Sequence, residues 1–107
     1  MASAYLFVDK SVAALEIDVI TDGLTATSLL DPALNKLVSA GQQPDGSLKV
    51  LIFGVNREIF IGRCVAINNF VTGIQKVIGS DPDGIAIDGV NIFWLNELGG
   101  VTVNVSA

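Results

Sequence analysis

The sequence groups three aspartates, Asp81, Asp83 and Asp88, within eight residues. Carboxylate oxygens are ligands that Ca²⁺ prefers in proteins, so these residues are candidate metal ligands, and calcium is the one cofactor that the sequence suggests. Each of them also neighbours Pro or Gly, as aspartates in tight turns often do. The spacing lacks the later glutamate of a helix–loop–helix calcium loop, so a purely structural role in turns is the alternative.

Residues that usually carry catalysis are missing from the sequence or stand far apart. The chain has no histidine, and Glu16, Glu58 and Glu97 are widely spaced. Neither a nucleophile with its base nor a pair of differently tuned carboxylates is visible, so we predict that the protein is not an enzyme. Cys64 is the single cysteine and has no disulfide partner. We expect a small buried side chain there, with a reactive thiol as the alternative.

Composition also bears on which partners the protein can bind. Six Lys and Arg stand against eleven Asp and Glu, for a net charge of −5, and the basic residues are scattered. Binding to nucleic acid is therefore not expected, since that needs clustered positive charge. A sugar could stack on exposed aromatic rings such as Trp94 or Tyr5. Most aromatic residues lie in apolar runs, so packing in the core is the alternative for Trp94.

Strands are expected to position these side chains, because apolar residues recur at every second position in several segments. Over residues 12–20 the odd-numbered positions from 13 to 19 are apolar, while Glu16 and Asp18 fall on the opposite face. A short strand is expected over residues 5–8, and the polar residues 9–11 predict a tight loop between the two strands.

A second clear strand covers residues 47–55, directly after a Pro-Asp-Gly turn. Val50 and Ile52 fall on one face, and Lys49 and Leu51 fall on the other. Because apolar residues occur on both faces, this strand should be central in its sheet, or its outer face should meet another layer or a partner.

One short helix is expected among the strands. Asp31 is suited to cap a helix and Pro32 to occupy its first position, which predicts a helix over residues 31–38. The segment is short and Gly41 follows it, so a surface helical turn or a strand remains open for residues 34–39.

Breaks in the apolar pattern predict two further features. The period slips at residues 68–69, which indicates a β-bulge, although an amphipathic helix over residues 63–77 is the alternative. Asp-Gly at residues 88–89 separates the apolar runs 85–87 and 90–94, as in a tight hairpin.

Seven to nine short strands with frequent turns are typical of a β-sandwich or a small barrel. Strands are also expected over residues 24–30, 59–71 and 101–105. We therefore expect one all-β domain, a β-sandwich, over residues 1–107. The start of the chain lacks the basic and apolar regions of a signal peptide, and no apolar run reaches the length of a membrane-spanning helix.

Several of these segments, taken in order, resemble cohesin modules over most of residues 12–105. The segment DGSLKVLIFGVN at residues 45–56 resembles one of the strands of that family, and SDPDGIAI at residues 80–87 resembles its closing part. The other segments that carry the resemblance are residues 12–19, 23–29, 59–67 and 100–103.

The resemblance implies a nine-stranded jelly-roll sandwich in a larger extracellular or cell-surface protein, without catalysis, which docks a dockerin-type partner through one sheet face. The partner-binding residues would then be Glu16, Asp18, Lys49 and Leu51, with an ordinary solvated sheet face as the alternative. Two other functions stay open. One is a carbohydrate-binding module, and the other is a structural subunit of a phage or surface assembly whose sheet edges pair in a homo-oligomer.

Overall fold

Most of the alternating segments form strands in the computed structural model, which describes residues 1–104. The strands within this range are β1 (Ala2–Val12), β2 (Ala14–Thr21), β3 (Ala26–Ser28), β4 (Leu37–Gln42), β5 (Leu48–Phe53), β6 (Phe60–Ile67), β7 (Val71–Ser80), β8 (Ala86–Ile87), β9 (Ile92–Leu98) and β10 (Val101–Val103). The prediction that the last strand reaches residue 105 extends beyond the described residues.

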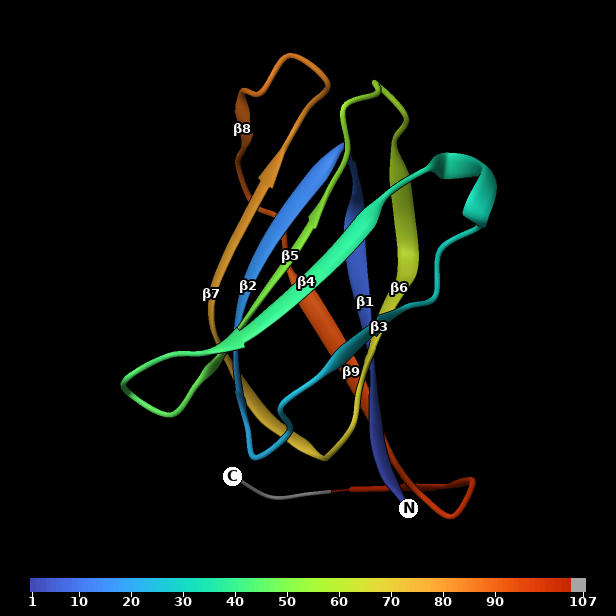
Figure 1. Ribbon diagram of the computed structural model, residues 1–107, viewed down its shortest axis with the longest axis vertical. Coiled ribbons are helices and arrows are strands. Elements are labelled where there is room, and N and C mark those ends of the chain that lie inside the picture. Colours follow the sequence, from blue (N-terminus) through green and yellow to red (C-terminus); the bar gives the residue numbers. More distant parts are fainter. Residues whose placement is uncertain (105–107) are drawn as a thin grey trace.

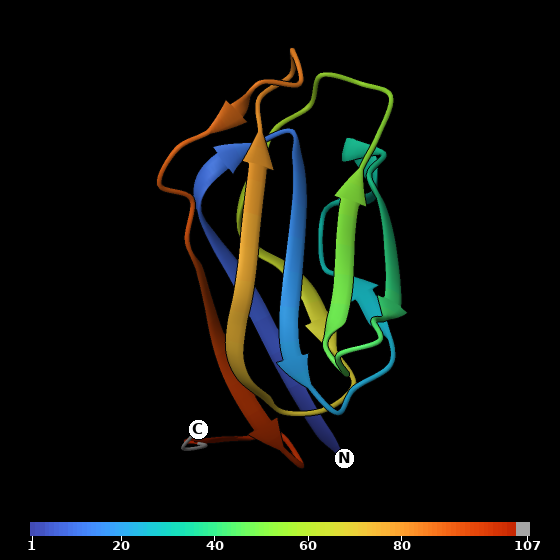
Figure 2. The same cartoon turned by 90° about the vertical axis from the view of Figure 1, so that its left-hand side faces the viewer.

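The strands form two antiparallel sheets of five strands each, packed face to face (Figures 1 and 2). Sheet A has the order β10-β9-β1-β6-β3, and sheet B has the order β4-β5-β2-β7-β8. The predicted all-β sandwich is thus confirmed at the level of two packed antiparallel sheets. Within residues 1–104, no helix is long and apolar enough to cross a membrane.

The core lies between the sheets and is built from the inward side chains of both. The alternation predicted for β2 and β5 is confirmed, because their inward residues are at most 2% exposed: Leu15, Ile17, Val19, Leu48, Val50 and Ile52. Burying a side chain of this size contributes roughly 1.5–3 kcal/mol to stability. Strand β5 lies between β4 and β2, so its predicted interior position in the sheet is also confirmed.

A buried amide joins the two sheets at one point. Asn96 of β9 is only 4% exposed. Its Oδ1 accepts a hydrogen bond from the Val71 N–H of β7, and its Nδ2 donates to the Val71 C=O, both at 2.8 Å. The side chain therefore satisfies two buried backbone groups of the opposite sheet, which ties β9 to β7.

The loop predicted at residues 9–11 is wrong, because β1 continues through these residues to Val12. Polar side chains are tolerated there since they are exposed and bonded to the segment before β9. The Asp9 N–H donates to the Asn91 C=O, and the Asp9 carboxylate accepts from the Asn91 N–H. The chain turns only at Ala13, whose N–H donates to the Ser80 C=O.

Residues 68–69 form the turn between β6 and β7, so the predicted bulge is wrong, and so is the alternative helix over residues 63–77. The Asn68 Oδ1 accepts hydrogen bonds from the Leu24 and Thr25 N–H groups. The polar break in the pattern therefore marks a loop whose amide binds a neighbouring loop.

The hairpin predicted at residues 88–89 is also wrong. Strand β8 pairs with β7 in sheet B, whereas β9 pairs with β1 in sheet A, so Asp88 and Gly89 lie in a crossing between the sheets. Gly89 still adopts a positive φ of 74°. The hairpin of this region is made one turn earlier, at residues 81–84, between β7 and β8.

The predicted helix is reduced to a single 3₁₀ turn, η1 (Pro32–Leu34). Asp31 caps it as expected, since its Oδ1 accepts from the Ala33 N–H at 2.9 Å. Asn35 then adopts a left-handed conformation with φ 52°, which ends the turn. Strand β4 follows at once, so the alternative of a strand in this region is confirmed from Leu37 onward.

Candidate functional site

The four residues predicted to bind a partner lie together on the outer face of sheet B, the face turned away from the core. Glu16 of β2 is directly opposite Leu51 of β5, and Asp18 is opposite Lys49. Neighbours across two strands in register lie on the same face of a sheet. The structure thus brings all four side chains into one patch.

Glu16 is the centre of a charged group on this face. Its Oε2 lies 3.2 Å from the Lys76 Nζ of β7 and 3.8 Å from the Lys49 Nζ. Asp18 is opposite Lys76 as well as Lys49. It is 8% exposed. The amines of Lys49 on β5 and Lys76 on β7 therefore lie on either side of the two carboxylates of β2. The Asp18 Oδ1 is buried and accepts no hydrogen bond.

Beside this charged group the face is hollowed and apolar. A hollow of about 280 Å³, here called the face hollow, opens where β2 begins and where β5 and β7 end. Phe53 and Ile78, both on its wall, are each 42% exposed. The side chains lining it on the outer face of sheet B are Ala14, Glu16, Leu51, Phe53, Ile78 and Ser80. A hollow with apolar walls and one charged rim residue can receive an apolar side chain of a partner.

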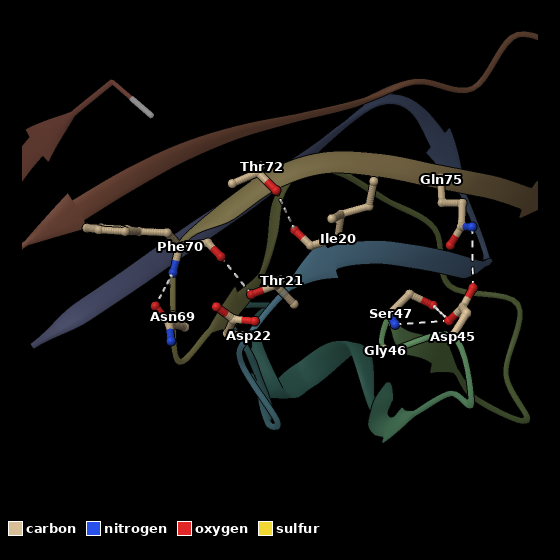
Figure 3. Close-up of a pocket in the computed structure, with 10 residues that line it drawn as sticks. All are labelled: Ile20, Thr21, Asp22, Asp45, Gly46, Ser47, Asn69, Phe70, Thr72 and Gln75. Atoms are coloured by element: carbon tan, nitrogen blue, oxygen red, sulfur yellow. Dashed lines mark hydrogen bonds between the residues drawn. The ribbon is translucent and has the colours of Figure 1, made fainter. Parts of the chain in front are cut away.

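A second, larger hollow of about 510 Å³ lies at one end of the sandwich (Figure 3). Polar residues from three turns and from β7 surround it: Asp22, Asp45, Ser47, Asn69, Thr72 and Gln75. Asp45 is already engaged, because its Oδ1 accepts from the Ser47 Oγ and N–H and its Oδ2 from the Gln75 Nε2. The hydrogen bond from the Ser47 hydroxyl contributes most to lowering the Asp45 pKa. This end hollow is lined by two carboxylates and by no Lys or Arg side chain, so it does not suit anions.

Two of the three aspartates proposed as calcium ligands engage their carboxylates with other groups of the chain. The Asp81 Oδ1 accepts from the Asp83 and Ile85 N–H groups, at 2.9 and 3.0 Å. Asp83 forms an ion pair with Arg57 at 2.8 Å, and Asp88 binds Lys10 through its backbone C=O. Across residues 1–104, no group of three or more His, Cys, Asp or Glu side chains is placed to hold a metal ion. The geometry thus favours the turn interpretation.

Cys64 and Trp94 both face the interior. Cys64 is fully buried, as predicted, and burial raises the pKa of its thiol to about 12. This thiol is therefore not the reactive one considered from the sequence. Trp94 is opposite Leu6 of β1, on the inner face of sheet A, and packs half-buried against the core. Its inward position makes it less suited to stack on a sugar than the rings of an outer face.

The outer face of sheet A carries an aromatic row of which the sequence analysis named only Tyr5. Phe7 of β1 is opposite Phe93 of β9, and Tyr5 is opposite Leu95. Phe93 is 59% exposed, and the Arg63 guanidinium lies 4.2 Å from the centroid of the Tyr5 ring. The sequence contains a signal for this row, because the outward residues of β1 and β9 alternate with the core residues of these two strands.

Both outer faces suit binding by contact. Sheet B offers paired charges around a hollow, whereas sheet A offers a row of rings with a cation over one of them. Comparisons of this chain with protein-family models, with curated proteins and with solved structures found no match.

Proposed function

We propose that this chain is a non-catalytic binding module of the cohesin-like type, which docks a dockerin-type protein in an extracellular assembly through the outer face of sheet B. The observation that carries the proposal is the placement of Glu16, Asp18, Lys49 and Leu51 in one patch beside the face hollow. The resemblance in sequence implied such a face, and the register of β2 and β5 supports it.

The connectivity of the strands supports the jelly-roll part of the proposal. Along the chain, β1 belongs to sheet A, β2 to sheet B, β3 to sheet A and β4 to sheet B. After the β4–β5 hairpin, the chain crosses again to β6 and back to β7. Repeated crossing between two packed sheets is the pattern of jelly-roll sandwiches.

In the proposed docking, the face hollow and the charged group around Glu16 have different roles. An apolar side chain of the partner enters the face hollow between Leu51, Phe53 and Ile78, where it loses contact with water. The charged group around Glu16 lies at the rim and favours a partner whose charges alternate in the complementary order.

Carbohydrate binding is a second candidate, favoured by the aromatic row on sheet A. Phe7 and Phe93 lie side by side on an outer face, where rings can stack on sugars. The same pair also has a structural explanation, because aromatic pairs across strands stabilise sheets. The Trp94 side chain, which the sequence suggested for this role, packs inward and does not contribute.

Two matched phenylalanine variants test the proposal against this alternative. A panel of dockerin-type modules is titrated against the wild-type chain, Phe53→Ser and Phe93→Ser, and each variant is also tested for retention on insoluble polysaccharides. We expect Phe53→Ser to weaken binding of a dockerin-type module by about tenfold or more and Phe93→Ser to leave it unchanged, because only Phe53 lines the face hollow. Polysaccharide retention that is lost only in Phe93→Ser would instead establish the carbohydrate function.

A further inference from the structure

Within residues 1–104, the four edge strands of the sandwich differ in length and in how well they are protected. Edge strands β3 and β10 have three residues each, and β8 has two. Strand β4, the remaining edge, has six residues, Leu37–Gln42, with no charged residue and no proline. Its register with β5 is continuous, without a bulge. Natural edge strands are commonly shortened, charged, bulged or covered, which prevents pairing with another chain. Strand β4 is not short, carries no charge and has no bulge.

The backbone groups that β4 leaves open can be identified from its register. The Gln43 N–H donates to the Ser47 C=O at the end of the hairpin. Hydrogen-bonded pairs alternate along antiparallel strands, so Ser39 and Gly41 are bonded to β5. The N–H and C=O groups of Val38, Ala40 and Gln42 consequently point away from β5, toward the open edge.

We propose that β4 pairs with β4 of a second copy of this chain, antiparallel and about a two-fold axis at Ala40. In this register Val38 is opposite Gln42 of the second copy, and Ala40 is opposite its own equivalent. All three residues with open backbone groups then form hydrogen-bonded pairs. The two copies of sheet B join into one continuous sheet.

The side chains fit a second copy of the same strand. On the outer face Ser39 is opposite Gly41 of the second copy, so small residues meet. Beyond the strand, the segment at Lys36 is brought beside the turn of the second copy that holds Asp45. Exposed Leu37 lies at the same end of the strand, beside a hollow of about 430 Å³ that also includes Phe53 and Val55. The turn of the second copy would cover this hollow.

Pairing of one strand of six residues buries less surface than a stable dimer needs, so the association is weak and depends on concentration. The inference goes beyond the proposed function and does not rest on it, because the edge of β4 and the outer face of sheet B are different surfaces. Both can be occupied at once.

Sedimentation equilibrium of the chain alone, up to submillimolar concentration, tests the proposal. We expect a reversible monomer–dimer equilibrium for the wild type. Ala40→Pro removes an N–H of the open edge and no bond to β5, a position where proline is tolerated, and should weaken the dimer by about tenfold or more. Gly41→Ala is the control: it keeps the N–H, and the added Cβ meets no atom within 4 Å in the single chain. It should leave the dimer unchanged.

Charge variants of one exposed residue fix the register independently. In the proposed pairing the two copies of Ser39 are diagonal neighbours, within reach of long side chains. Ser39→Lys and Ser39→Glu should each dimerise less than the wild type, and an equal mixture of the two should recover the dimer. A wild type that stays monomeric throughout, an Ala40→Pro dimer as strong as the wild type, or a mixture no stronger than its components would overturn the proposal.

Discussion

The outer faces of the two sheets differ in what they expose. Sheet A presents a row with Phe7, Phe93 and Leu95, whereas sheet B presents a hollow bordered by Phe53 and by a group of alternating charges. Phe93 is more exposed than Phe53, at 59% against 42%. If exposed apolar surface alone marked a binding site, sheet A would be the better candidate.

The proposed function gives the shape and charge of a face more weight than its apolar area. Specific interfaces are about as apolar as the rest of a protein surface, and their binding energy comes from a few side chains in desolvated pockets. Sheet B combines such a pocket with charges that can select a partner. The following predictions test whether this contrast between the faces is real.

The largest effect is expected at Asn96, which joins the sheets that carry the two faces. Asn96→Ala leaves the N–H and C=O of Val71 buried without partners, and we expect the free energy of unfolding to fall by about 2–4 kcal/mol. Trp94 fluorescence reports on sheet A, since it is the single tryptophan, and amide exchange of β2 reports on sheet B. Both measurements should show the same decrease in the free energy of unfolding.

The matched control for this change is Asn104→Ala, because Asn104 is exposed at the end of the described chain. It should leave the stability within about 0.5 kcal/mol of the wild type. A second outcome would contradict the prediction: sheet A loosens in Asn96→Ala while the amides of β2 keep their protection from exchange. The two sheets would then be separately stable layers that Asn96 does not couple.

The second effect concerns the core that both faces share and depends on pH. Burial raises the Cys64 pKa from 9.0 to about 12, so the unfolded chain loses this proton first as the pH rises. Stability should therefore fall above pH 9, with a limiting slope of about 1.4 kcal/mol per pH unit from this group. Cys64→Ala removes the contribution, so its free energy of unfolding should depend less steeply on pH over this range. Equal slopes in denaturant titrations would show that the thiol is accessible to water.

The smallest effects are expected for single charges on the two faces. Glu16→Gln on sheet B and Arg63→Gln on sheet A should each change stability by less than about 1 kcal/mol, because exposed ion pairs and cation–π contacts are weak. Their effects on partner binding should differ. Glu16→Gln should alter the association rate and its dependence on salt, and Arg63→Gln should alter neither. Equal changes in both variants would remove the distinction between the faces.

The sequence predicts the faces of β2 and β5 well because burial imposes a period of two on their side chains. That is why Glu16 and Leu51 could be placed on an outer surface. Lys76 and Ile78 were missed, because β7 shows no such alternation. Its pairing with β2 contains register shifts, which put successive residues out of phase with the core.

The hairpin at residues 88–89 fails for a different reason. Asp-Gly provides the local conformation of a turn, and Gly89 adopts a positive φ of 74°. Local chemistry does not determine which strands pair on either side. Here β8 and β9 belong to different sheets, so the same dipeptide serves a crossing.

The most direct test of the account is an NMR titration of the labelled chain with a dockerin-type module that binds it. The account predicts that the amide shifts of β2, β5 and β7 change, with the largest changes around Leu51, Phe53 and Ile78, while those of β1 and β9 stay in place. Shifts concentrated at Phe7, Phe93 and Leu95 would contradict it and would assign binding to the outer face of sheet A.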